Sequence, residues 1–147
     1  MSAAIFNARG VKPARPITEG GCLCGRVRYR ASAPPIRAVH CHCSLCRRSS
    51  GAAYLTWIMF PAQAFAFTQG TPAIYKATAK AERAFCPACG TPLTFRHVES
   101  ADKVDVTVGS LDDPNAVKPG DHIWVSARVA WLHLDDGLPR HPGERGE

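Results

Sequence analysis

Long apolar stretches are missing from this sequence. The longest mostly apolar run, 52–60, is interrupted by Thr56 and ended by Pro61, and it falls far short of the ~20 residues that a membrane helix needs. The first sixteen residues contain basic but no acidic side chains, and no apolar run of the length that a secretory signal requires. We therefore expect no membrane helix, a cytoplasmic location and a flexible N-terminal arm over 1–16.

Motifs that define several large enzyme classes are also missing. The chain has no phosphate-binding glycine loop of the Walker type, no G-x-S-x-G turn and no dinucleotide fingerprint, so the classes that depend on these motifs are excluded. The net charge is +6 and the pI about 9.1, yet no run of five or more basic residues occurs. Because nucleic-acid interfaces gather their basic residues into a patch or stripe, nucleic acid is not the expected partner.

Alternating apolar and basic residues predict β structure. Val27, Tyr29 and Ala31 alternate with arginines, which is the period of two expected for a strand with one solvated face. Turn residues such as Pro, Gly and Asn separate further strand candidates. The expected strands are 25–31, 37–41, 53–60, 64–68, 73–77, 82–86, 93–97, 103–108 and 123–130.

The single good helix candidate is short. It covers 44–50, with Ser44 as its expected N-cap. At 147 residues, with 46% hydrophobic and 20% charged residues, the chain fits one domain with its own apolar core. The sequence thus predicts a mainly β, single-domain fold with one short helix after the second cysteine cluster.

Seven cysteines are present, and in a reducing compartment their close spacing indicates metal ligands or catalytic thiols rather than disulfides. The first set consists of two tight turns, each followed by glycine: Cys22 with Cys24, and Cys86 with Cys89. Four thiolates complete the tetrahedral shell of zinc and leave no position for substrate. This set is therefore expected to be a structural zinc site; the alternative is four buried or redox-active cysteines without metal.

The second set is a C-x-C-x₂-C triplet made of Cys41, Cys43 and Cys46, beside His40 and His42. Three thiolates with a free fourth position is the ligand count of a catalytic zinc, and their negative charge suits the binding of a substrate thiol better than hydrolysis. The alternative is a closed Cys₃His site. Alternation along the extended segment places both histidines opposite the cysteines, which argues against that alternative.

Several segments, in this order and spacing over roughly 18–140, resemble a known family, the glutathione-dependent formaldehyde-activating enzymes, also called the Gfa-like or centromere-protein-V-like family. The segments are G-G-C-L-C-G (20–25), C-H-C-S-L-C-R-R (41–48), Gly51, F-C-P-A-C-G-T-P-L (85–93), G-S-L-D-D-P (109–114), H-I-W (122–124), Trp131 and D-G-L-P (136–139).

The resemblance implies a β fold of the Mss4-like type over 17–140. The tail over 141–147 is expected to be loose because the chain after Leu138 is rich in Pro, Gly and charge. The resemblance also implies two zinc ions per chain: a structural zinc on the first cysteine set and a catalytic zinc on Cys41, Cys43 and Cys46. It further implies carbon–sulfur lyase activity on an adduct of a small thiol, such as glutathione, and an aldehyde. The alternative is a zinc-stabilised binding module whose basic surface contacts nucleic acid or protein.

A few other residues bear on this choice. Arg47 and Arg48 follow the third cysteine on the expected helix and either contact a thiol substrate's carboxylate or belong to a solvated helix face. His122 is expected to be a buried, hydrogen-bonded histidine; the alternative is a ligand or a proton shuttle. The acidic pairs at 112–113 and 135–136 are expected to belong to turns; the alternative is a general acid or base. The three tryptophans, Trp57, Trp124 and Trp131, are expected in the core or in a pocket wall.

Overall fold

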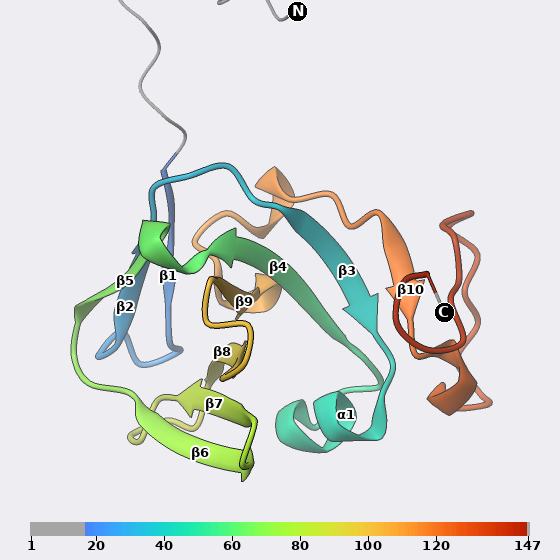
Figure 1. The fold of residues 1–147 in the computed structure, drawn as a ribbon, viewed down its shortest axis with the longest axis horizontal. Helices are drawn as coiled ribbons and strands as arrows, with labels where there is room; N and C mark the ends of the chain where they lie inside the picture. Colours follow the sequence, from blue (N-terminus) through green and yellow to red (C-terminus); the bar gives the residue numbers. More distant parts are fainter. Residues whose placement is uncertain (1–16, 147) are drawn as a thin grey trace, which may run out of the picture.

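The computed structural model describes residues 17–146, so the expected arm over 1–16 lies outside the described residues. The described part contains two β-sheets and one α-helix, α1 (Ser44–Ser50) (Figure 1). The expectation of a mainly β, single-domain fold with one short helix after the second cysteine cluster is confirmed.

The larger sheet has seven strands in the order β10-β3-β4-β9-β8-β7-β6, and its pairings are antiparallel except that between β10 and β3. The smaller sheet has the order β1-β2-β5 and is antiparallel throughout. The strands are β1 (Thr18–Gly21), β2 (Arg28–Ala31), β3 (Arg37–Cys41), β4 (Leu55–Pro61), β5 (Phe65–Gln69), β6 (Ala73–Thr78), β7 (Ala81–Phe85), β8 (Pro92–His97), β9 (Lys103–Thr107) and β10 (Asp121–Ile123). Three 3-10 helices lie between strands and a fourth follows β10: η1 (Ala62–Ala64), η2 (Val108–Ser110), η3 (Pro114–Ala116) and η4 (Val125–Ala127).

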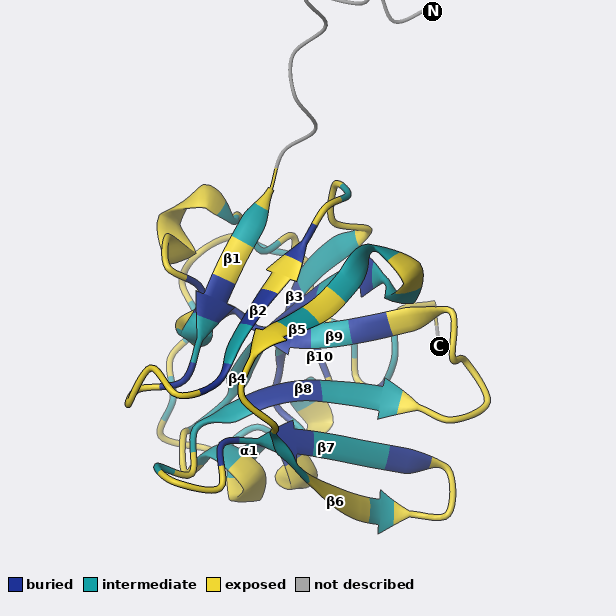
Figure 2. Ribbon diagram, turned by 90° about the vertical axis from the view of Figure 1, so that its left-hand side faces the viewer, coloured by how far each residue is buried: buried dark blue, intermediate teal, exposed yellow. Residues whose placement is uncertain are grey.

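The main core lies where the two sheets face each other. On β2, Tyr29 and Ala31 are buried while Arg30 is exposed, as the alternation in the sequence predicted (Figure 2). These side chains belong to one buried cluster with residues of β4, β8 and β9, including Phe60 and Leu93. Such interdigitated apolar side chains exclude water and supply most of the folding free energy.

The first strand, β1, was not predicted from the sequence. It contains two glycines and little apolar character, and it forms because it pairs with β2. Gly20 is required there, since a Cβ at this position would overlap the Tyr29 side chain and the carbonyl oxygen of Ser110. This close approach determines how the chain enters the first cysteine turn.

The strand predicted over 123–130 is wrong beyond its first residue. β10 ends at Ile123, and Trp124 adopts a left-handed backbone conformation with a φ of 56° before η4 begins. The amide of Trp124 donates to the carbonyl of Gly143 at 2.9 Å. A tertiary contact with a distant segment thus stops a strand that local propensity favoured.

That distant segment is the end of the chain, where the sequence predicted a loose tail. The amide of His141 donates to the carbonyl of His122 at 2.9 Å, and the amide of Val125 donates to the carbonyl of His141 at 3.1 Å. The guanidinium of Arg145 lies 3.3 Å from the buried carboxylate of Asp121. Within 141–146, therefore, the structure holds the chain against β10 and η4.

Asp105 on β9 provides a test of the packing. Burial raises the pKa of its carboxyl to about 6, although Arg37 lowers it in part. Because the folded pKa exceeds the unfolded value, the protonated form stabilises the fold, and this contribution is lost as the pH rises through about 6. We expect Asp105→Asn to increase the free energy of unfolding by about 1–2 kcal/mol at about pH 8 and by almost nothing near pH 4.

Urea unfolding of both proteins at the two pH values measures this difference. Asp102→Asn, which changes an exposed carboxylate in the turn before β9, serves as the control. It should leave the free energy of unfolding unchanged at both pH values. A loss of stability in Asp105→Asn at about pH 8 would contradict the prediction.

Candidate metal centres

The first cysteine cluster joins two turns that lie far apart in the sequence. The sulfur atoms of Cys22, Cys24, Cys86 and Cys89 all lie within 4.8 Å of one another. The Sγ–Sγ distance is 3.5 Å between Cys22 and Cys24 and 3.7 Å between Cys24 and Cys86. A zinc tetrahedron with bonds of about 2.3 Å has edges of about 3.8 Å. The four sulfurs thus fit a tetrahedral metal ion with little rearrangement.

Backbone geometry and Thr91 hold these sulfurs in place. Gly25 and Gly90 adopt φ angles of 77° and 78°, which only glycine reaches readily, and so close the two turns. The Thr91 hydroxyl accepts from the amide of Leu23 at 3.0 Å and lies 3.1 Å from Cys89 Sγ, to which its own proton can be donated. This hydrogen bond lowers the pKa of Cys89 to about 5. Thr91 thereby links the two turns and favours the thiolate form that binds metal.

The second cluster lies where β3 passes into α1. Cys41 ends the strand, Cys43 precedes the helix and Cys46 lies in its first turn, and their three sulfurs also lie within 4.8 Å of one another. Hydrogen bonds from the thiols of Cys41 and Cys46 lower the pKa of Cys43 to about 2. In the described part of the chain no histidine joins this group of potential ligands. Two cysteine clusters could therefore hold metal ions.

The N-cap of α1 is Cys43, and the prediction of Ser44 is wrong by one residue. Cys43 has the extended backbone of a cap residue, and its sulfur accepts from the amide of Cys46 at 3.3 Å. Ser44 is the first residue inside the helix. The same sulfur thus serves as helix cap and as potential metal ligand, which fixes its direction.

Two side chains outside the cysteine motif approach Cys46. The indole N–H of Trp57 donates to its sulfur at 3.4 Å, and Nη2 of Arg83 lies 3.9 Å from it. The Arg83 guanidinium is 4.8 Å from the centre of the Phe95 ring and donates to the Ser49 hydroxyl at 3.2 Å. A cation held beside three thiolates offsets their negative charge. Sequence reasoning missed Arg83, because only the fold brings β7 next to α1.

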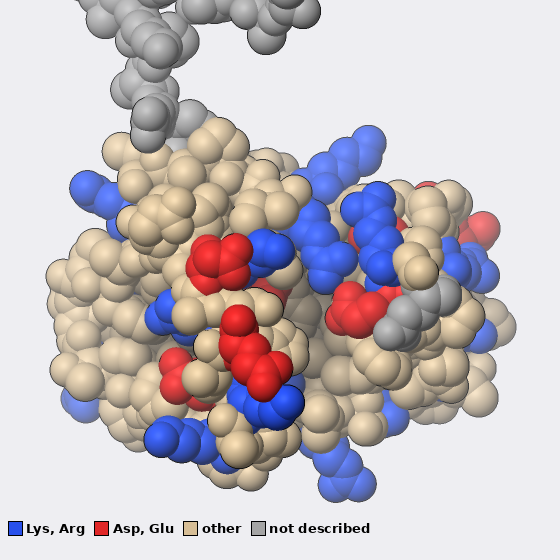
Figure 3. Space-filling model, in the orientation of Figure 1, with Lys and Arg blue, Asp and Glu red and all other residues tan. Residues whose placement is uncertain are grey.

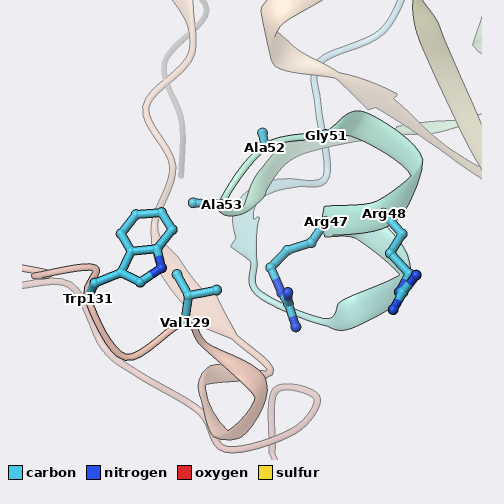
Figure 4. Close-up of a pocket in the computed structure, with 7 residues that line it drawn as sticks. All are labelled: Arg47, Arg48, Gly51, Ala52, Ala53, Val129 and Trp131. Carbon is cyan, nitrogen blue, oxygen red and sulfur yellow. The ribbon is translucent and has the colours of Figure 1, made fainter.

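Arg47 and Arg48 line a shallow hollow of about 370 Å³ beside α1 (Figure 4). Nε of Arg47 is buried without a hydrogen-bond partner. The other wall of the hollow includes the indole of Trp131, which is 70% exposed. Trp57 is buried in the core and Trp131 lies in the wall of this hollow, and both positions agree with the prediction.

A chain of polar side chains lies beside the other face of β3. Nε2 of His42 lies 2.9 Å from Nδ1 of His122, and Nε2 of His122 lies 2.8 Å from Oδ2 of Asp136. His122 is 1% exposed, so the prediction of a buried, hydrogen-bonded histidine is confirmed. The hydrogen bond from His122 lowers the pKa of Asp136, and burial lowers the pKa of His42 to about 4. The sequence indicated a turn at Asp136.

The surface is electrically mixed. On the face seen in Figure 3, acidic groups lie among the Lys and Arg side chains. One acidic residue of the 112–113 pair, Asp112, forms a two-pronged ion pair with Arg28, which lowers the pKa of the carboxyl. No helix within 17–146 is long and apolar enough to cross a membrane.

Fold and site together define a β-rich domain with two thiol clusters, one of four cysteines and one of three. The chain belongs to the family of glutathione-dependent formaldehyde-activating enzymes, whose family model matches residues 17–127. The family resemblance noted in the sequence is thereby confirmed.

Two curated relatives agree with this membership. The chain is 32% identical over 128 residues to a protein of Halomonas elongata whose name assigns it provisionally as a glutathione-dependent formaldehyde-activating enzyme, a match that covers 81% of this chain and 82% of that protein. It is also 33% identical over 90 residues to an uncharacterised lyase of Schizosaccharomyces pombe, and this match covers 56% of this chain and 59% of the yeast protein. The matched region therefore spans less than two thirds of the yeast relative.

A solved structure shares the fold. It is the crystal structure of a Rhodobacter sphaeroides protein, with a TM-score of 0.53 and 20% sequence identity, and the match covers 84% of this chain and 98% of that one. At this identity the likeness concerns the fold alone.

Proposed function

We propose that this protein is a zinc-dependent carbon–sulfur lyase that forms and splits the adduct of a small thiol, such as glutathione, with an aldehyde. The observation that supports it most is the gathering of Cys41, Cys43 and Cys46, with no fourth protein ligand beside them among the described residues. Such a set suits a metal site that keeps one position for a substrate. The reducing cytoplasm, where free cysteines persist, is the proposed location.

The two cysteine clusters divide the work in this proposal. Cys22, Cys24, Cys86 and Cys89 would hold a structural zinc, and Cys41, Cys43 and Cys46 a catalytic one. When bound at the second cluster, zinc would keep a substrate thiol ionised near neutral pH. Trp57 and Arg83 act through Cys46, because their N–H groups stabilise negative charge on its sulfur.

The chemical change needs no oxidant or reductant. In the forward direction the thiol sulfur bonds to the carbonyl carbon of the aldehyde, the carbonyl double bond opens, and the proton lost by the thiol ends on the oxygen as a hydroxyl. The reverse direction breaks the same carbon–sulfur bond. What the protein must supply is orientation of the two reactants and neutralisation of charge.

Arg47 and Arg48 are the proposed contacts for the thiol substrate. Glutathione carries two carboxylates, and the hollow beside α1 presents both arginines together with the indole of Trp131. A ligand carboxylate in the hollow would therefore lie beside two positively charged side chains. Planar guanidinium groups bind carboxylates in pairs of hydrogen bonds.

This assignment predicts a selective effect of Arg47→Met. Loss of one charge-assisted contact of about 1.4 kcal/mol raises the half-saturating concentration of glutathione about tenfold. Cysteamine, a thiol without a carboxylate, should be used as well by the variant as by the unchanged protein. Exchange of formaldehyde between its free and thiol-bound forms, followed by NMR, measures the half-saturating concentration of each thiol.

The matched control is Arg26→Met, which removes an exposed arginine that does not line the hollow and should change neither value. Equal losses for glutathione and cysteamine in Arg47→Met would contradict a carboxylate contact. Absence of exchange with every thiol in the unchanged protein would contradict the lyase proposal itself.

A further inference from the structure

We propose that His40, His122 and Asp136 bind a divalent transition-metal ion at a third site, built from nitrogen and oxygen ligands and separate from the cysteine clusters. Their potential ligand atoms all lie within 4.8 Å of one another. Nε2 of His122 is 2.8 Å from Oδ2 of Asp136. Two neighbouring ligands of an octahedral ion, with bonds of about 2.1 Å, lie about 3.0 Å apart. This pair therefore already has the separation of two adjacent ligands.

Strand register brings the two histidines together. β10 and β3 run parallel, and His122 is the direct partner of His40 in their ladder. The two imidazole rings are 4.7 Å apart between centres and inclined by 30°. Side chains that are partners across neighbouring strands point to the same face of the sheet. Both rings are thus presented on one face by the backbone.

A tight turn supplies the carboxylate. Oδ1 of Asp136 accepts from the amide of Leu138 at 3.1 Å, which holds the side chain and leaves Oδ2 directed to His122. The amide of His122 donates to the carbonyl of Pro139 at 2.8 Å, so the turn is bonded to β10. Local backbone contacts therefore hold the third ligand in place, so the Asp136 side chain does not rotate freely at the surface.

Each histidine is also oriented through its second nitrogen. Nδ1 of His40 lies 2.8 Å from the hydroxyl of Thr56, which leaves Nε2 for a ligand. Nδ1 of His122 lies 2.9 Å from Nε2 of His42, so His122 can carry its proton on Nδ1 and present Nε2 to a metal. Metal-binding histidines typically have their other nitrogen held in this way.

The ligand set defines the kind of ion. Two imidazoles and one carboxylate leave positions for water or a small ligand and suit divalent iron, cobalt, nickel or manganese, without the thiolates that favour soft ions. The side chain of Asp136 is 41% exposed and that of His122 is 1% exposed, which places the site at the surface with one buried wall. Consecutive side chains of a strand point to opposite faces, so His40 faces away from Cys41 and the two sites are distinct.

Cobalt titration of the full chain tests this site. Protein without an affinity tag is first loaded with two equivalents of zinc, and Co²⁺ is then added while heat and the visible spectrum are recorded. We expect one further Co²⁺ per chain, with no sulfur-to-cobalt charge-transfer band. Asp136→Asn should weaken this binding at least about tenfold, and the fold should persist because asparagine can accept the same turn hydrogen bond from Leu138.

Asp135→Asn is the matched control, since it removes the neighbouring exposed carboxylate, which is not part of the ligand group, and it should leave Co²⁺ binding unchanged. Three outcomes would overturn the proposal: no third ion bound, equal binding by Asp136→Asn and the unchanged protein, or a charge-transfer band that shows cobalt entering the cysteine clusters. Glutathione turnover is not needed for this test, so it stands apart from the proposed function.

Discussion

Cys43→Ser is expected to remove one zinc ion per chain and to lower turnover at least ~100-fold, while the protein stays folded. The reason lies in the double role of this residue. Its sulfur is one of three potential ligands in the second cluster and also caps α1 by accepting from the amide of Cys46. Serine is a good N-cap and a poor zinc ligand, so the substitution separates the two roles.

Metal analysis of the purified variant, together with circular dichroism and the formaldehyde exchange assay, measures the three quantities. Ser44→Ala is the matched control: it changes the adjacent residue, which is neither the cap nor a potential ligand, and it should keep metal, activity and fold. Unfolding of Cys43→Ser would show that the second cluster is structural, and this result would contradict its proposed role as a catalytic site.

Cys86→Ser is expected to have the opposite profile and to unfold the domain. Cys86 is fully buried within the main core and belongs to the cluster that ties Cys22 to Cys89 across the sequence. Structural zinc in small domains contributes on the order of 10 kcal/mol to folding, which is comparable with the whole stability of about 5–15 kcal/mol. Loss of this zinc site therefore removes most or all of the free energy that keeps the domain folded.

Thermal unfolding followed by circular dichroism measures the effect, and a strong chelator added to the unchanged protein should reproduce it. Leu23→Ser is the matched control, because Leu23 lies in the same turn but is 88% exposed and offers no ligand; its melting temperature should stay within a few degrees of the unchanged value. A similarly small shift in Cys86→Ser would mean that the first cluster does not hold a structural metal.

The features that were predictable from the sequence are those encoded locally. The division of seven cysteines into four and three follows from spacing, and the structure brings the same two groups together. The helix bounds 44–50 and the strand bounds 37–41 agree with α1 and β3, and Gly51 ends the helix in a left-handed conformation that glycine adopts readily. Spacing along the sequence is enough to predict which residues come together when the motif lies within one turn of the chain.

The features that were missed depend on contacts between distant segments. Trp124 turns the chain out of the sheet because Gly143 accepts from its amide, and no local pattern encodes that bond. Arg83 reaches Cys46 only because the fold brings β7 next to α1. His40 and His122 meet through strand register, so their partnership with Asp136 is visible only in the fold.

The absorption spectrum of protein with cobalt in the second cluster, titrated with glutathione, tests the central claim most directly. Sulfur-to-cobalt charge-transfer intensity grows with the number of thiolate ligands. If Cys41, Cys43 and Cys46 leave one position for a substrate thiol, the intensity rises by about a third as glutathione binds, and Cys43→Ser abolishes the change. A spectrum that stays constant at saturating glutathione would contradict the open site.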